Sequence, residues 1–145
     1  MNLTDTVNLL IRTCRDGEEG FRACAGALPA GELRATLERH AGECAQAADE
    51  LKTVLARHGA EPQDATSLPG ALHRGWVIAT GALSGGSEHA ILAECERGED
   101  VALRDYHIAL EQDLPADVRQ VIEHQLEGVR RNHDQVKALR DARRG

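Results

Sequence analysis

The sequence predicts an all-α protein, a four-helix bundle in which a long crossover with a short extra helix joins two antiparallel helix hairpins. Three observations lead to this prediction. Aromatic residues make up only 2% of the 145 residues, whereas the helix-favouring types Ala, Leu, Glu, Arg and Gln dominate. Apolar residues recur at alternating spacings of four and three along four long segments. Breaks that contain proline separate these segments in pairs, and the length suits one domain over residues 1–145.

The first hairpin is expected over residues 3–58. Pro29 ends the helix predicted at 3–28, because proline cannot continue a helix, and Gly59 is expected to cap the helix predicted at 32–58. The apolar stripe of the first helix consists of Leu3, Val7, Leu10, Cys14, Gly17, Phe21, Cys24 and Leu28. That of the second consists of Leu33, Leu37, His40, Cys44, Ala47, Leu51, Val54 and His58.

The second hairpin is expected over residues 88–142, after the crossover. Residues 59–69 have the composition of a loop, and a short helix is predicted at 69–83, with Ser67 as its N-cap and Trp76 as its docking anchor. Pro115 separates the helices predicted at 88–112 and 116–142. The stripe of the 88–112 helix consists of Leu92, Glu96, Glu99, Leu103, Tyr106 and Leu110, beside Cys95, Ala102 and Ala109. That of the 116–142 helix consists of Val118, Ile122, Gln125, Val129, Asn132, Val136 and Leu139.

Composition and motifs exclude several classes of function. The net charge of −7 argues against a nucleic-acid partner, because phosphate binding requires a basic surface. No apolar run approaches the length of a membrane span and no signal peptide is visible, so we expect a cytoplasmic protein without a membrane partner. No phosphate loop, nucleotide fingerprint or hydrolase motif identifies an enzymatic activity or a small-molecule substrate. Apolar helix faces permit a homodimer.

The four cysteines form no CxxC pair, and without an export signal they are not expected to form a disulfide framework. Most of them lie on the apolar stripes. We interpret them as small buried hydrophobic residues, with redox or metal chemistry as the alternative. They are Cys14, Cys24, Cys44 and Cys95.

Polar residues occupy stripe positions that the heptad pattern reserves for apolar side chains, namely His40, Glu96 and Glu99. Hairpin geometry places Glu18 opposite His40, and Glu96 opposite His133. Buried carboxylates require a compensating positive species, because burying a bare charge is costly. Four carboxylates and two imidazoles form the ligand set of di-iron and di-manganese sites in helical bundles, and zinc also accepts such ligands. The predicted metal ligands are Glu18, His40, Glu43, Glu96, Glu99 and His133.

A metal-free polar network is the alternative. The same geometry places Arg130 opposite Glu99, where the two side chains would form a buried ion pair. His40 would then be a core histidine with satisfied hydrogen bonds, and the bundle a non-enzymatic structural or protein-interaction module. Gly17 and Gly98 each precede a predicted ligand, and they leave room either for a ligand or for close packing of two helices.

Five stretches carry a resemblance to a known family: DGEEGF at 16–21, HRGW at 73–76, ECERGED at 94–100 with Tyr106, DLP at 113–115 and HDQVKALRD at 133–141. With these stretches the chain resembles an uncharacterised bacterial family of four-helix-bundle proteins, a domain of unknown function with a ferritin-like fold. The resemblance implies two helix hairpins joined by a crossover, and no established activity.

The wider ferritin-like group carries a glutamate on its first and third helices and Glu-x-x-His on its second and fourth. Glu18 and Glu99 (or Glu96) match the single glutamates. The second helix has Glu43-x-x-Gln46 and the fourth has Arg130-x-x-His133, so both depart from the full motif. The hypothesis is therefore a bundle that binds one or two ions of iron, manganese or zinc at its centre, with a stress- or redox-related role.

Overall fold

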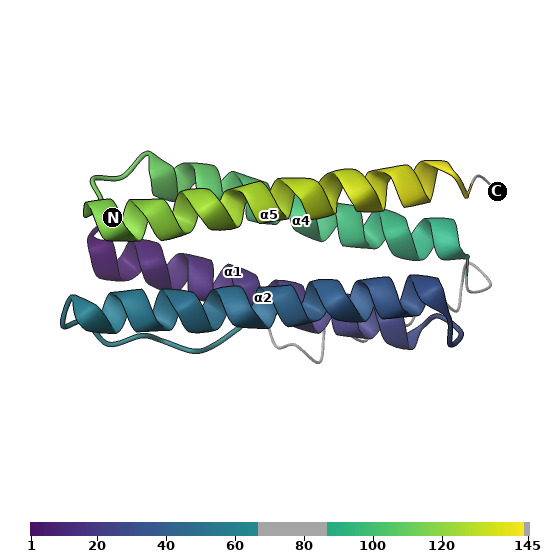
Figure 1. Cartoon of the computed structure of the whole chain (residues 1–145), viewed down its shortest axis with the longest axis horizontal. Coiled ribbons are helices and arrows are strands. Elements are labelled where there is room, and N and C mark those ends of the chain that lie inside the picture. The colour runs from purple at the N-terminus through teal and green to yellow at the C-terminus, as the bar shows by residue number, and fades with distance from the viewer. Residues whose placement is uncertain (67–86, 144–145) are drawn as a thin grey trace.

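The computed structural model describes residues 1–66 and 87–143, and within these ranges four helices form a bundle (Figure 1). The prediction of an all-α four-helix bundle is confirmed. The helices are α1 (Leu3–Gly26), α2 (Glu32–Arg57), α4 (Glu88–Leu110) and α5 (Ala116–Asp141). The short helix expected at 69–83, with Ser67 and Trp76, lies outside the described residues. No helix in the described part of the chain is both long and apolar enough to cross a membrane.

The helices pair as two antiparallel hairpins, α1 with α2 and α4 with α5 (Figure 1). The end of α2 and the start of α4 lie at opposite ends of the bundle, so the connection between the hairpins crosses its length. The first part of this connection is fastened to α1. Asn8 Oδ1 accepts a hydrogen bond from the backbone N–H of Gln63, and Arg15 donates to Asp64. Lys52 also donates to Asp64, and these two cations lower the pKa of that carboxyl to about 2.

Local signals fix the helix ends. The side chain of Asn2 caps α1 by accepting a hydrogen bond from the backbone N–H of Asp5 at 2.8 Å. At the end of α2 the backbone must turn through a left-handed conformation, and Gly59 adopts it with a φ of 75°. The expected capping role of Gly59 is thereby confirmed.

The apolar core consists of two clusters, one toward each end of the bundle. The first cluster contains Leu10, Leu51 and Ile122, from the N-terminal half of α1, the C-terminal half of α2 and the N-terminal half of α5. The second contains Phe21 and Leu37, which lie nearer the other end of the first hairpin. A core divided in this way leaves the middle of the bundle to polar and small residues.

The buried stripe of α4 differs from the expected one. It runs through Leu92, Cys95, Glu99, Tyr106 and Ala109, which are all buried. The stripe therefore combines residues from the two neighbouring stripes that the sequence offered. The other predicted acid, Glu96, is only half-buried and contacts α5. Of the two acids predicted on this stripe, only Glu99 is buried, and α4 buries two further acids, Glu94 and Asp105.

Gly17 and Gly98, the two helix glycines that precede predicted ligands, differ in the space around them. A Cβ placed at Gly17 would lie 3.1 Å from Sγ of Cys44, so Gly17 permits the close approach of α1 and α2. A Cβ placed at Gly98 would meet no described atom within 4 Å. Close packing thus accounts for the first glycine and not for the second.

We predict that Gly98→Ala raises the free energy of unfolding by about 1 kcal/mol, the usual gain in helix propensity. Gly17→Ala should gain less or lose stability, because its new methyl group presses on Cys44. Urea denaturation of both variants at one pH measures the difference. Equal stabilisation by the two substitutions would contradict the packing difference.

Candidate metal centre

Three potential metal ligands meet where α4 and α5 lie side by side. The Nε2 atom of His133 lies 2.8 Å from Oδ1 of Asp100 and 3.8 Å from Oε1 of Glu96. One ligand atom of each residue lies within 4.8 Å of the others, and no other such group of three occurs in the described part of the chain. Glu96 and Asp100 are one helical turn apart, so their side chains project from the same side of α4. The expected opposition of Glu96 and His133 is confirmed.

Both distances from His133 are short enough for its imidazole and either carboxylate to bind the same ion. Two ligand atoms that each lie about 2.1 Å from an ion are at most about 4.2 Å apart. Both distances from His133 meet this condition. The side chains of Glu96 and His133 are 14% and 17% exposed, whereas Asp100 is 60% exposed, so the cluster has a buried side and an open side. Water can therefore complete the coordination.

A neighbouring acid can orient the imidazole. Nδ1 of His133 lies 3.5 Å from Oδ1 of Asp134. In the hydrogen bond to Asp100, Nε2 carries the proton, because a carboxylate can only accept. A metal ion would replace that proton, and the imidazole would then hold a proton on Nδ1, beside Asp134. Metal-binding histidines are commonly held in one tautomer by such a partner on the second nitrogen.

One arginine competes with a cation at this cluster. Arg140 donates a hydrogen bond to Oε2 of Glu96, and its other contact is Asp141. Glu96 is thereby paired with a positive charge on one oxygen, while its other oxygen faces His133. The positive charge that the sequence predicted near the site is therefore present, but it comes from Arg140.

The predicted pairing of Arg130 with Glu99 is wrong. Arg130 is exposed, and its guanidinium lies 3.3 Å from Nε2 of His107. Glu99 is buried on the core-facing side of α4. Hairpin register gives the height of a residue along the bundle, but it does not give the direction of its side chain around the helix axis.

The expected opposition of Glu18 and His40 is likewise not found. Glu18 accepts hydrogen bonds from Arg15 and Arg22 on its own helix. His40 is buried against the ring of Phe21, with centroids 5.2 Å apart, and its Nε2 bonds to Gln135 at 2.8 Å. Burial lowers the pKa of His40. Neither residue joins the α4–α5 cluster.

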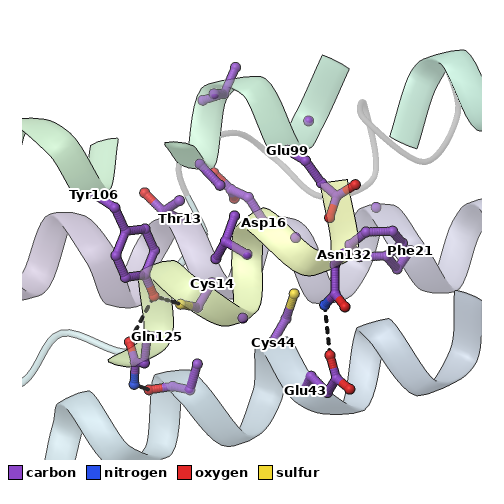
Figure 2. A pocket seen from close by; sticks show the side chains of 18 of the residues that line it. Thr13, Cys14, Asp16, Phe21, Glu43, Cys44, Glu99, Tyr106, Gln125 and Asn132 are labelled. Carbon is purple, nitrogen blue, oxygen red and sulfur yellow. Dashed lines mark hydrogen bonds between the residues drawn. The ribbon is translucent and has the colours of Figure 1, made fainter. Parts of the chain in front are cut away.

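The remaining two predicted ligands, Glu43 and Glu99, line a cavity in the middle of the bundle (Figure 2). The cavity has a volume of about 530 Å³ and receives residues from all four helices. Glu99 extends into it from α4 and Glu43 from α2. Glu43 accepts a hydrogen bond from Nδ2 of Asn132 at 2.6 Å.

Glu99 is an unusual carboxyl group because it is 5% exposed and its Oε1 has no hydrogen-bond partner among the described residues. Burial, together with the smaller effect of the nearby carboxylates Asp100, Glu96, Glu43 and Asp134, raises its pKa to about 8. The group therefore keeps its proton near neutral pH unless a positive species enters the cavity.

A buried polar chain borders the cavity and joins all four helices (Figure 2). The hydroxyl of Tyr106 donates to Oε1 of Gln125 at 2.7 Å, and Nε2 of Gln125 donates to the backbone carbonyl of Ala47 at 3.1 Å. Sγ of Cys14 lies 3.3 Å from the same hydroxyl. Because the tyrosine proton is used toward Gln125, the thiol of Cys14 is the donor in that contact.

The cysteines are free thiols in a low-dielectric environment. Three are buried and Cys44 is half-buried. Burial raises the pKa of Cys14 to about 11 and that of Cys44 well above its ordinary value. Thiols that keep their protons are poor nucleophiles and poor metal ligands. Their interpretation as small hydrophobic residues agrees with this environment.

Asp100 was not among the predicted ligands. It lies off the apolar stripe, and the ligands were predicted from polar residues on or beside that stripe. Its spacing of four residues from Glu96 was the available signal, because residues at this spacing share one side of a helix.

Comparison with known families identifies the chain. A family model described as Domain of unknown function (DUF2383) matches residues 2–112. This match covers most of the chain, which therefore belongs to that family. No curated protein matches the chain.

Proposed function

We propose that this protein is a metal-binding helical bundle that holds one divalent transition-metal ion through Glu96, Asp100 and His133. The observation that supports the proposal most is the meeting of these three ligand atoms within 4.8 Å of one another. Two carboxylates and one imidazole suit zinc, manganese and ferrous iron. Iron or manganese would give the site a redox role, whereas zinc has no redox chemistry.

The residues around the cluster support this assignment in two ways. Asp134 lies beside Nδ1 of His133, where it can fix the imidazole for binding through Nε2. The exposure of Asp100 leaves a side of the cluster open to solvent. An ion can therefore enter without opening the bundle. The ligands predicted elsewhere, Glu18 and His40, have other partners and are not required.

The metal-free alternative also has a specific observation in its favour. Arg140 already pairs with Glu96, so the cluster can exist as a network of ion pairs and hydrogen bonds. Under this alternative the bundle is a structural or protein-interaction module, and the network joins α5 to α4. The two functions predict different effects of removing Arg140: a higher metal affinity under the first, and a loss of stability under the second.

We predict that Arg140→Gln increases the affinity for Co²⁺ on the order of tenfold, because the variant removes a positive charge from beside the ion. Absorption titration of the full chain with Co²⁺, after removal of bound metal, measures the affinity. Arg143→Gln is the matched control, since Arg143 pairs with Glu88, which is not part of the cluster. Absence of saturable Co²⁺ binding in both the wild type and Arg140→Gln, with a loss of stability in that variant, would reject the metal site and favour the network.

A further inference from the structure

The central cavity has the size and the walls of a binding site for a small organic molecule. Its volume of about 530 Å³ lies in the usual range for such sites. Small residues create the space, among them Gly98, where a Cβ would meet no described atom within 4 Å. Apolar walls are provided by Phe21, Val129 and the thiols of the cysteines. Gln46, Glu50 and His124 line the cavity and are exposed, so it opens to solvent between α2 and α5.

The charge on the walls is strongly negative. Seven lining residues are acidic, and one, Arg131, is an arginine. Within this wall, Glu99 is buried, extends into the cavity (Figure 2), and has an oxygen, Oε1, that no described group bonds. A buried acceptor without a partner is costly, and a ligand that supplies a donor removes that cost.

The nearby charges determine the kind of donor that fits. Four acids whose charges act on Glu99 come from three helices: Glu96 and Asp100 from its own helix, Glu43 from α2 and Asp134 from α5. This negative field favours a donor that carries a positive charge. A bare metal ion is a poorer fit, because the described residues include no three-ligand group at Glu99. An anionic ligand is excluded by the same field.

We propose that this cavity binds an organic ammonium ion with an apolar body, of the size of an alkylamine, whose ammonium group donates to Glu99. The apolar body lies against Phe21, Val129 and the alanine and cysteine side chains of the wall. Glu43, held by Asn132 on another wall, adds to the attraction for the cation. This site is distinct from the cluster of Glu96, Asp100 and His133, since neither Glu96 nor His133 lines the cavity.

The test compares three probes of one length: octylamine, octanol and octanoate. Isothermal titration of the full chain, with chelator present, should give saturable binding of octylamine, weaker binding of octanol and no binding of octanoate. Glu99→Gln should reduce the affinity for octylamine about tenfold or more, the usual contribution of a hydrogen bond to a charged group, and leave octanol unaffected.

Glu127→Gln is the matched control, because it makes the same replacement at an exposed position outside the cavity. It should bind octylamine as the wild type does. Circular dichroism establishes that each variant is folded. Absence of saturable octylamine binding to the wild type, or equal affinity in wild type and Glu99→Gln, would overturn the proposal. Octanoate binding as tight as octylamine binding would overturn it as well.

Discussion

Replacing Glu99 with glutamine is expected to raise the free energy of unfolding by about 3 kcal/mol at pH 7 and by about 5 kcal/mol at pH 9. The pKa of Glu99 is about 8 in the folded protein, against an ordinary value of 4.5. Between these two values the unfolded chain ionises this carboxyl group and the folded chain does not. Ionisation therefore favours the unfolded state increasingly as the pH rises. Glutamine does not titrate, so the variant avoids this loss.

The pH dependence of the difference is the sharper part of this prediction. Below pH 4.5 the carboxyl group is protonated in both states, so the wild type and Glu99→Gln should be about equally stable. The stability difference should grow from pH 4.5 to pH 8 and then remain constant. Urea denaturation across this range, with a chelator present to remove metal, measures it. Glu127→Gln serves as the exposed control and should show no such slope.

A Glu99→Gln variant that is less stable than the wild type at pH 8 would contradict the burial of an unpartnered acid. It would mean that the carboxylate is ionised in the folded state and stabilised by a positive group. The usual acidic residue behaves in this opposite way, as Asp64 does beside Arg15 and Lys52.

Replacing His133 with asparagine is expected to weaken Co²⁺ binding on the order of a hundredfold or more. Changes in the partners of metal ligands alone cost tenfold to a hundredfold, and here a ligand itself is removed. Asparagine retains a polar side chain of similar size, so the contact between α4 and α5 is altered little. The absorption titration described for Arg140→Gln measures the affinity.

His124→Asn is the matched control for this variant. His124 is an exposed histidine of the same helix and does not belong to the three-residue cluster. Its replacement should leave Co²⁺ affinity unchanged. Equal losses in the two variants would indicate that Co²⁺ binds weakly to surface histidines, and would contradict a defined site on α4 and α5.

The fold could be predicted because its signals are local and repeated. The heptad spacing from Val7 to Cys24 fixes the buried face of α1, and Pro29 and Pro115 lie in the breaks between the paired helices. The opposition of Glu96 and His133 followed from counting outward from a turn, because two helices joined by a short turn stay in register.

The site was predicted only in part, because a side chain's direction depends on small rotations of each helix. A shift of the buried stripe toward Cys95 places Glu99 in the core and turns Glu96 toward α5. Glu18 was expected at the centre, yet it lies between Arg15 and Arg22 on its own helix. The spacing of residues in the sequence does not determine which ion-pair partners these side chains contact.

The cavity could not be predicted from the sequence at all. Its volume depends on how far the helices stand apart between the two core clusters. The four-residue and three-residue spacing describes which residues face inward, and contains no information on that separation. Gly98 is an example, because a glycine in the sequence is compatible both with close helix packing and with an open space, and only the structure shows the open space.

The most direct test of the account is a crystal of the full chain soaked in Co²⁺ or Zn²⁺, with data collected on both sides of the metal absorption edge. We expect one strong anomalous difference peak between α4 and α5, within bonding distance of Glu96, Asp100 and His133. A peak in the central cavity beside Glu43 and Glu99 would contradict it. The absence of any peak in crystals soaked above the measured dissociation constant would contradict it equally.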